Sequence, residues 1–180
     1  LLDEVAEIGI ATEALAAYAE LVTLPCYEWQ HVLVLPEGHP LGQKTDLTLE
    51  DIALEHLITY HPAYTGRTRI DQAFAERKLK PRIALEAIDS DVIKTYVRLG
   101  LGVGIAAEMA LRDTPADGSA SEFVVRPLGH LFGLNVTRVA FKRSAYLRNF
   151  VLKFAELISP RLSPELVARA MTSHVSDRDL

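Results

Sequence analysis

The sequence predicts an α/β fold, and three observations support this. Short apolar runs with the length of strands alternate along the chain with longer segments in which apolar residues recur at helical spacing. The 180 residues are 49% hydrophobic and 24% charged, which is typical of a soluble globular protein with one large domain or two small lobes. No low-complexity run or internal repeat interrupts the pattern. The alternating order predicts parallel sheets with crossover helices.

The first half of the chain contains most of the predicted strands. Apolar runs bounded by turn-forming residues predict strands at residues 7–11, 21–27, 31–35, 57–60 and 83–87. A loop rich in proline and glycine occupies residues 36–40. Thr48 caps a short helix at 48–53, whose first turn carries acidic residues that favour the helix dipole. A second helix at 66–78 is stopped by Pro81.

The second half repeats the alternation. A helix at 89–99 has Asp89 or Ser90 as its cap, and Gly100 stands where left-handed backbone ends a helix. Further strands are predicted at residues 102–106, 123–127 and 135–142. Further helices are predicted at residues 108–111, at 146–158 and from residue 163 onward. Residues 113–121 are expected to form an exposed loop, and the polar tail after Met171 is expected to fray.

The charge and the lengths of the apolar runs exclude several function classes. With 24 acidic and 19 basic residues the net charge is −5, so residues 1–180 alone are not expected to bind nucleic acid. The apolar runs are too short to cross a bilayer, and the acidic N-terminus is unlike a signal peptide. A lone cysteine, Cys26, excludes an intramolecular disulfide and agrees with a reducing compartment. We expect a cytoplasmic protein. The opening residues, without a methionine or a complete first element, suggest a fragment of a longer chain.

Several motifs are better explained by structure than by chemistry. The glycines of residues 100–104 follow a predicted helix and open a strand, the reverse of the order in a dinucleotide-binding loop. Cys26 is interpreted as a buried thiol, because nothing in the sequence places His31 or His39 as its base. The six histidines show no spacing that holds zinc. The sequence therefore predicts no metal, no cofactor and no catalytic residue.

Two segments are candidates for ligand binding. In residues 10–15 (IATEAL), Thr12 ends a strand at the carboxyl edge of a predicted parallel sheet, where ligands of α/β sheets collect. Residues 26–29 (CYEW) contain Tyr27 and the only tryptophan of the chain, Trp29. Capping and core packing are the alternative explanation for both segments.

A third candidate segment, residues 60–67 (YHPAYTGR), leads from a strand into the start of a helix. Thr65 and Gly66 offer a hydroxyl and a close backbone approach, while free N–H groups and the helix dipole can hold an anion. The charge of Arg67 could point either toward such a ligand or toward Asp71, one helical turn on.

These segments also resemble a known family. The effector domain of LysR-type transcriptional regulators of the CysB kind is similar to residues 10–15, 24–29 (LPCYEW), 65–67 (TGR), 79–83 (LKPRI) and 91–104 (DVIKTYVRLGLGVG). The similarity runs from residue 7 to about residue 169. The motif at 91–104 is long enough to be specific to this branch, whereas the motif at 39–41 (HPL) is shared by LysR regulators generally.

The resemblance implies two Rossmann-like lobes of periplasmic-binding-protein type, joined by two crossover strands, with the effector between them. The first lobe would comprise residues 1–27 and 135–180, and the second residues 28–134. In this family the effector is an acetylated serine, and sulfate or thiosulfate can occupy an anion site. The motifs and the resemblance together give the candidate ligand-binding residues Thr12, Tyr27, Trp29, Thr65, Gly66 and Arg67.

The chain departs from the family in two places. Where the family usually has a threonine and phenylalanines, residues 61–64 (HPAY) precede the TGR motif, so the pocket wall and effector preference are expected to differ. The family's helix-turn-helix and the first strand of its first lobe have no counterpart in these residues. Promoter DNA would then be bound only through such an upstream segment, in a homo-oligomer that the family suggests is a tetramer.

The sequence is thus best interpreted as a ligand-sensing domain without catalytic activity. One rival is a transport-type binding protein for sulfate or amino acids, which would share the architecture but be exported. A second rival is an enzyme acting on a small anionic substrate through Cys26 or His61.

Overall fold

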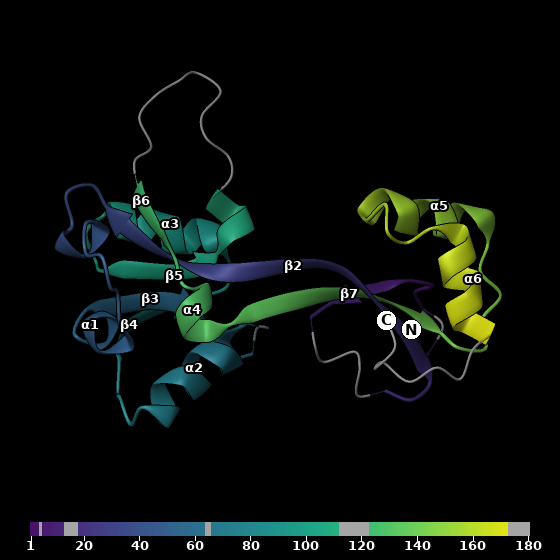
Figure 1. Cartoon of the computed structure of the whole chain (residues 1–180), viewed down its shortest axis with the longest axis horizontal. Coiled ribbons are helices and arrows are strands. Elements are labelled where there is room, and N and C mark those ends of the chain that lie inside the picture. Colours follow the sequence, from purple (N-terminus) through teal and green to yellow (C-terminus); the bar gives the residue numbers. More distant parts are fainter. Residues whose placement is uncertain (4, 13–17, 64–65, 112–122, 173–180) are drawn as a thin grey trace, which may run out of the picture. The chain divides into compact units, whose positions relative to one another are not determined.

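The protein folds into two compact units. The computed structural model describes residues 1–3, 5–12, 18–63, 66–111 and 123–172. One unit comprises Leu1–Glu28 together with Asn135–Leu180, and the other comprises Trp29–Leu134. Both units are α/β, as the alternating sequence pattern predicts, and Figure 1 labels the α-helices and the strands from β2 to β7.

In the described residues, the first unit is built on three strands. Strand β7 (Leu134–Lys142) lies between β1 (Gly9–Ala11) and β2 (Leu21–Pro36) in the order of the sheet. Helices α5 (Asn149–Ile158) and α6 (Pro164–Thr172) supply the other side of its core. That core contains Leu24, Cys26, Val139, Phe141, Val151, Ala155, Leu162 and Val167.

The second unit is a five-stranded mixed sheet. Its centre is parallel, because β3 (His56–Tyr60) pairs in parallel with both β4 (Arg82–Ala87) and β5 (Val103–Ala107). Strand β5 also pairs antiparallel with β2, on the side away from β3. Strand β6 (Phe123–Pro127) pairs antiparallel with β2.

Helices cover both faces of this second sheet. Helices α1 (Leu49–Ala53) and α2 (Arg67–Glu76), with the single-turn helix α4 (Gly129–Phe132), bury one face, and α3 (Ser90–Arg98) buries the other. Because successive side chains of a strand point to opposite faces, Leu33 and Leu35 join the α2 side while Val32 and Val34 join the α3 side. Short 3-10 helices complete the unit at Pro40–Gly42 and Glu108–Leu111.

Local signals in the sequence predicted the helix ends well. Thr48 and Asp51 form a reciprocal capping box on α1, and the Asp89 side chain accepts a hydrogen bond from the backbone N–H of Val92 at the start of α3. Gly100, with φ +76°, ends α3 in left-handed backbone.

The structure differs from the sequence-based expectations for the strands and helices in three places. Residues 21–27 and 31–35 belong to one strand, β2, because the polar residues between them lie at exposed or half-buried positions that do not interrupt an extended backbone. The expected parallel pairing is present only where β3 pairs with β4 and β5, since β1 pairs antiparallel with β7, and β2 pairs antiparallel with β5 and β6. Helix α4 was missed because four residues are too few to show a helical period. The predicted loop at 113–121 and the tail from residue 173 onward lie outside the described residues.

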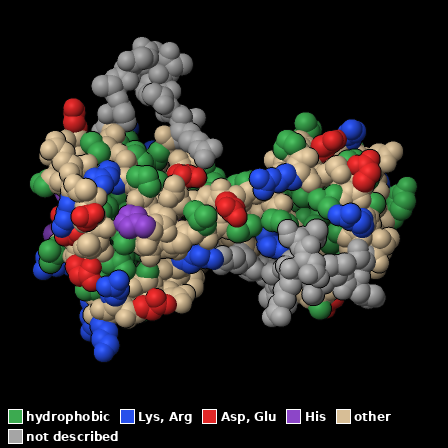
Figure 2. All heavy atoms as spheres, viewed as in Figure 1, with side chains coloured by type: hydrophobic (Ala, Val, Ile, Leu, Met, Phe, Trp, Pro, Cys, Tyr) green, Lys and Arg blue, Asp and Glu red, His purple; other side chains and the backbone are tan. Residues whose placement is uncertain are grey.

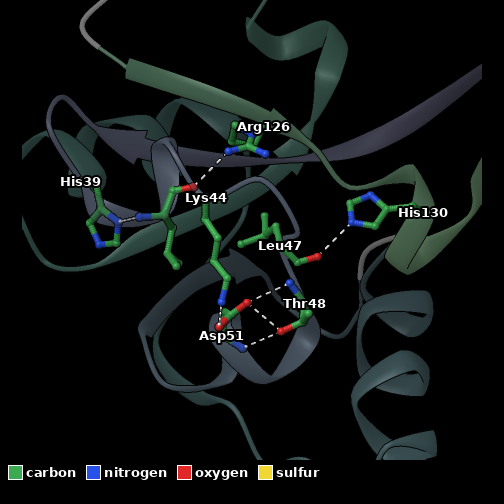
Figure 3. A network of polar contacts seen from close by, with 8 residues as sticks. His39, Lys44, Leu47, Thr48, Asp51, Arg126 and His130 are labelled. Carbon is green, nitrogen blue, oxygen red and sulfur yellow. Dashed lines mark hydrogen bonds and ion pairs between the residues drawn. The ribbon is translucent and has the colours of Figure 1, made fainter.

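A polar network fastens the loop that follows β2, as Figure 3 shows. The Arg126 guanidinium donates to the carbonyls of Leu41 and Gly42 at 3.2 and 2.8 Å, which ties the loop to β6. His130 on α4 lies 3.1 Å from the carbonyl oxygen of Leu47. The loop is therefore held near its middle and near its end by side chains from distant parts of the sequence.

Within the residues that the structure describes, no helix has both the length and the apolar character needed to cross a bilayer. On the face shown in Figure 2, acidic and basic side chains are interspersed over both units.

Candidate functional site

The carboxyl edge of the parallel strands in the second unit is cross-linked by hydrogen bonds. The hydroxyl of Tyr60, at the end of β3, accepts from the backbone N–H of Ala107 at 3.0 Å and shares a 2.6 Å hydrogen bond with the Ser90 hydroxyl. The backbone N–H of His61 donates to the carbonyl of Ala87 at 2.9 Å. These bonds join the ends of β3, β4 and β5 into a fixed platform just before α2 begins.

Gly66 is the N-cap of α2 and has φ +98°, a left-handed backbone conformation that favours glycine. A Cβ atom at this position would lie 3.0 Å from His31 Nε2 and 3.4 Å from Trp29 Cη2. Two independent constraints, the dihedral angle and the close approach to β2, therefore require glycine at the start of α2.

Arg67, the first residue of α2, is buried and its guanidinium is bonded to protein groups. Nε donates to the Asp71 carboxylate at 2.7 Å, and Nη1 donates to the Tyr60 carbonyl at 2.6 Å and to the Glu86 carboxylate at 3.1 Å. Of the two orientations open from the sequence, the structure has the one toward Asp71. Arg67 thus joins α2 to the ends of β3 and β4.

An aromatic cluster lies beneath the first turn of α2. Trp29 and His31 are separated by one residue on β2, so their side chains share the face on which α2 packs. Their rings meet edge to face with centroids 5.2 Å apart, and the His31 ring meets Phe132 of α4 at 5.8 Å. His31 was not among the candidates from sequence. Its spacing from Trp29 in an extended strand was the signal that could have found it.

His31 is neutral near pH 7. Its side chain is fully buried, and burial together with the positive charge of Arg69 lowers its pKa from 6.5 to about 4, burial being the larger cause. Because Arg69 lies in the first turn of α2, the charge and the helix dipole both make this end of the helix electropositive.

Thr12 and Tyr27 belong to the first unit. Thr12 follows β1 directly, and its Oγ1 atom is buried without a hydrogen-bond partner among the described residues. The strand before it pairs antiparallel with β7, so the expected parallel-sheet edge is not the reason for its position. Tyr27 lies in β2 with 40% of its side chain exposed.

The structure therefore brings together part of the predicted set. Trp29 and Gly66 are neighbours in the second unit, and Arg67 is adjacent to them through α2. Thr12 and Tyr27 belong to the other unit. Thr65 lies outside the described residues.

The alternative reactive groups are not arranged for catalysis. Cys26 is buried in the first unit, where burial raises the pKa of its thiol and so disfavours the reactive thiolate. His61 belongs to the second unit, and its Nδ1 accepts from the backbone N–H of Ala63 at 3.2 Å. Among the described residues no cluster of three or more histidine, cysteine or acidic side chains could hold a metal ion.

Comparison with known proteins gives one family. Residues 1–163 match the LysR substrate binding domain. The chain is 48% identical over 180 residues to the HTH-type transcriptional regulator CysB of Burkholderia cenocepacia, covering all of this chain and 56% of that protein. It is 44% identical over 168 residues to the regulator SsuR of the same organism, covering 93% of this chain and 53% of that protein.

A solved structure agrees with the sequence comparison. The cofactor-binding domain of the Cbl transcriptional regulator matches with a TM-score of 0.84 and 43% identity, over 96% of this chain and 75% of that one. The chain spans about half the length of the curated relatives it matches, at 56% and 53%.

Proposed function

This chain belongs to the LysR substrate-binding domain family, and on that premise we propose that it senses a small effector of sulfur metabolism for a transcriptional regulator. Domains of this family have two lobes like those of periplasmic binding proteins. The relatives at high identity are transcriptional regulators, so neither the transport alternative nor the enzyme alternative has support. The genes controlled would be those of sulfur assimilation and cysteine biosynthesis.

The observation that carries this proposal is the buried hydroxyl of Thr12. A buried polar atom without a hydrogen-bond partner costs free energy, and native structures rarely tolerate one without a reason. Thr12 Oγ1 is such an atom among the described residues, and it follows β1, where the candidate ligand segment begins. We assign it to the effector, whose oxygen atoms would complete its hydrogen bonding.

In the second unit, the start of α2 is the proposed anion-binding position. The first turn of this ten-residue helix contains no acidic residue, and Arg69 adds positive charge near it. Such an end favours a carboxylate or a sulfur oxyanion, since the free backbone N–H groups and the dipole act in the same direction. Thr65 and Gly66 would contact the anion, while Trp29 and Tyr27 would form the wall. Arg67 enters this proposal as a positioning residue, because its guanidinium is bonded to Asp71, Glu86 and the Tyr60 carbonyl.

The effector that fits these groups is an acetylated serine, with sulfate or thiosulfate as an alternative occupant of the anion position. The lobes would be residues 1–27 with 135–180, and residues 28–134. The full-length protein would be a cytoplasmic homo-tetramer. An effector that binds one arrangement of the domain more tightly than another shifts the conformational equilibrium of this tetramer toward that arrangement. Promoter DNA would be contacted by a helix-turn-helix segment upstream of these residues.

Calorimetric titration of the full-length protein with acetylserine, sulfate and thiosulfate tests the proposal. We expect saturable binding of at least one of the three, with succinate as a control dianion that binds more weakly. Absence of binding heat for all three compounds at millimolar concentration would contradict the proposed effector class. Tighter binding of an amino acid that has no part in sulfur metabolism would contradict the proposed effector class as well.

A further inference from the structure

His31 is a polar residue at a core position, where packing alone would favour an apolar side chain. It is fully buried in β2, on the face of the sheet that α2 covers. Burying a polar ring requires giving up its interactions with water, a cost that leucine or phenylalanine at the same place would avoid. The residue types that follow it on the same face, Leu33 and Leu35, are the ones that core packing alone selects.

The contacts of His31 link three elements. Its Nε2 atom lies 3.0 Å from the position of a Cβ atom on Gly66, so the imidazole is directly against the backbone at the start of α2. Its ring also meets Trp29 at 5.2 Å and Phe132 at 5.8 Å, both edge to face. A shift of the imidazole would therefore move the N-terminal turn of α2 and the indole of Trp29 together.

We propose that His31 is a positioning residue for effector binding, which holds Gly66 and the Trp29 indole in the arrangement that receives the anion. This inference rests on the proposed function, because it assumes that the start of α2 binds the effector. His31 does not touch the effector. It acts through the two residues that lie above and beside its ring.

The close approach of Nε2 to Gly66 predicts which substitutions preserve binding. The side chain of glutamine reaches the position of Nε2 of histidine. The side chains of asparagine and leucine end at their δ atoms, one atom short of that position, so both lose the packing against the start of α2, although leucine keeps much of the volume. A residue that only fills space would tolerate leucine at least as well as glutamine, and a residue that positions α2 through Nε2 would not.

The test is a calorimetric titration of wild-type full-length protein and of His31→Gln, His31→Asn and His31→Leu with acetylserine and with sulfate. We expect His31→Gln to bind within about threefold of wild type, and His31→Asn and His31→Leu to bind at least about tenfold more weakly. Leu35→Val is the matched control, because it removes a methylene from a buried residue on the same strand and the same face of the sheet. It should lower the thermal midpoint without changing either dissociation constant.

Tryptophan emission supplies a second readout. The emission maximum attributable to Trp29, obtained by subtracting the spectrum of Trp29→Phe, should shift in His31→Asn and His31→Leu but not in His31→Gln or Leu35→Val. If His31→Asn fails to fold, the comparison of glutamine with leucine decides the question.

Three results would overturn the inference. Wild-type affinity in His31→Leu would show that packing at the Nε2 position is dispensable, and a loss in His31→Gln equal to that in His31→Leu would show that reaching this position is not what preserves binding. A wild-type protein that binds neither compound would instead refute the proposed function, and this inference with it. The wild-type titration therefore separates the two failures.

Discussion

The Nε2 atom of His31 lies 3.0 Å from the point at which a Cβ atom on Gly66 would sit. A Cβ atom at this distance would be closer to His31 than ordinary van der Waals contact allows. Strand β2 therefore packs tightly against the start of α2, which the sequence alone had marked for ligand binding. The left-handed φ of +98° at Gly66 adds a second constraint at the same residue. A substitution at Gly66 would add backbone strain and a close contact with His31. Comparison with a left-handed glycine that has no close neighbour separates these two effects.

Substituting Gly66 with alanine should weaken both folding and effector binding. The left-handed backbone costs about 1–2 kcal/mol for a residue with a Cβ atom, and contact with His31 adds to this. Gly38→Ala is the matched control, because Gly38 has φ +76° but no atom within 4 Å of its Cβ position. Urea unfolding and calorimetry should show a loss of stability in both variants and a loss of affinity only in Gly66→Ala. Equal affinity in the two variants would argue that the start of α2 is not part of the site.

Replacing Thr12 with valine should weaken binding and leave stability unchanged or slightly higher. Valine has nearly the same shape, and the hydroxyl that it removes has no hydrogen-bond partner among the described residues. Loss of a hydrogen bond to a charged ligand should cost roughly 1.5–3 kcal/mol of binding free energy. The control is Thr59→Val, since Thr59 Oγ1 donates to the buried Ile105 carbonyl at 3.4 Å. That variant should lose about 1 kcal/mol of stability and no affinity. The reverse pattern, with Thr12→Val unstable but binding normally, would remove Thr12 from the site.

Substituting Arg67 with lysine should lower stability more than affinity. Lysine lacks the planar fork that reaches Asp71, Glu86 and the Tyr60 carbonyl together, and a carbonyl left without its donor costs about 1–3 kcal/mol. Arg77→Lys, at a side chain 68% exposed, should change the free energy of unfolding by less than about 0.5 kcal/mol. Denaturant titration of both variants provides the measurement. A large loss of affinity at unchanged stability would instead make Arg67 a direct ligand contact.

Stability should fall as the pH is lowered from about 6.5 toward 4. Burial lowers the pKa of His31 to about 4 in the folded protein, from an ordinary value of 6.5. Between these values the unfolded state binds a proton that the folded state refuses, so the free energy of unfolding decreases by up to about 1.4 kcal/mol per pH unit. His31→Gln should remove this part of the slope, which the difference between the two curves isolates from the carboxylates. Parallel curves for the two proteins across this range would show that His31 titrates normally.

The sequence by itself determined the features whose cause is local. The capping box of Thr48 and Asp51, the cap at Asp89 and the left-handed Gly100 each depend on residues within one helical turn, so their patterns can be read directly. The glycine at the start of α2 was marked for the same reason. The alternation of strand-like and helical segments predicted the α/β class, and the family resemblance added the two-lobe architecture, which no single segment specifies.

Tertiary structure alone decided which distant residues meet. That β2 is one strand, antiparallel to β5 and β6 and next to β7, depends on these partners, because an extended segment does not encode which edge it joins. The orientation of Arg67 was open until the Glu86 carboxylate and the Tyr60 carbonyl were placed beside it. The burial of His31 and its lowered pKa depend on packing against α2 and α4. The periodicity of the sequence does not specify these contacts.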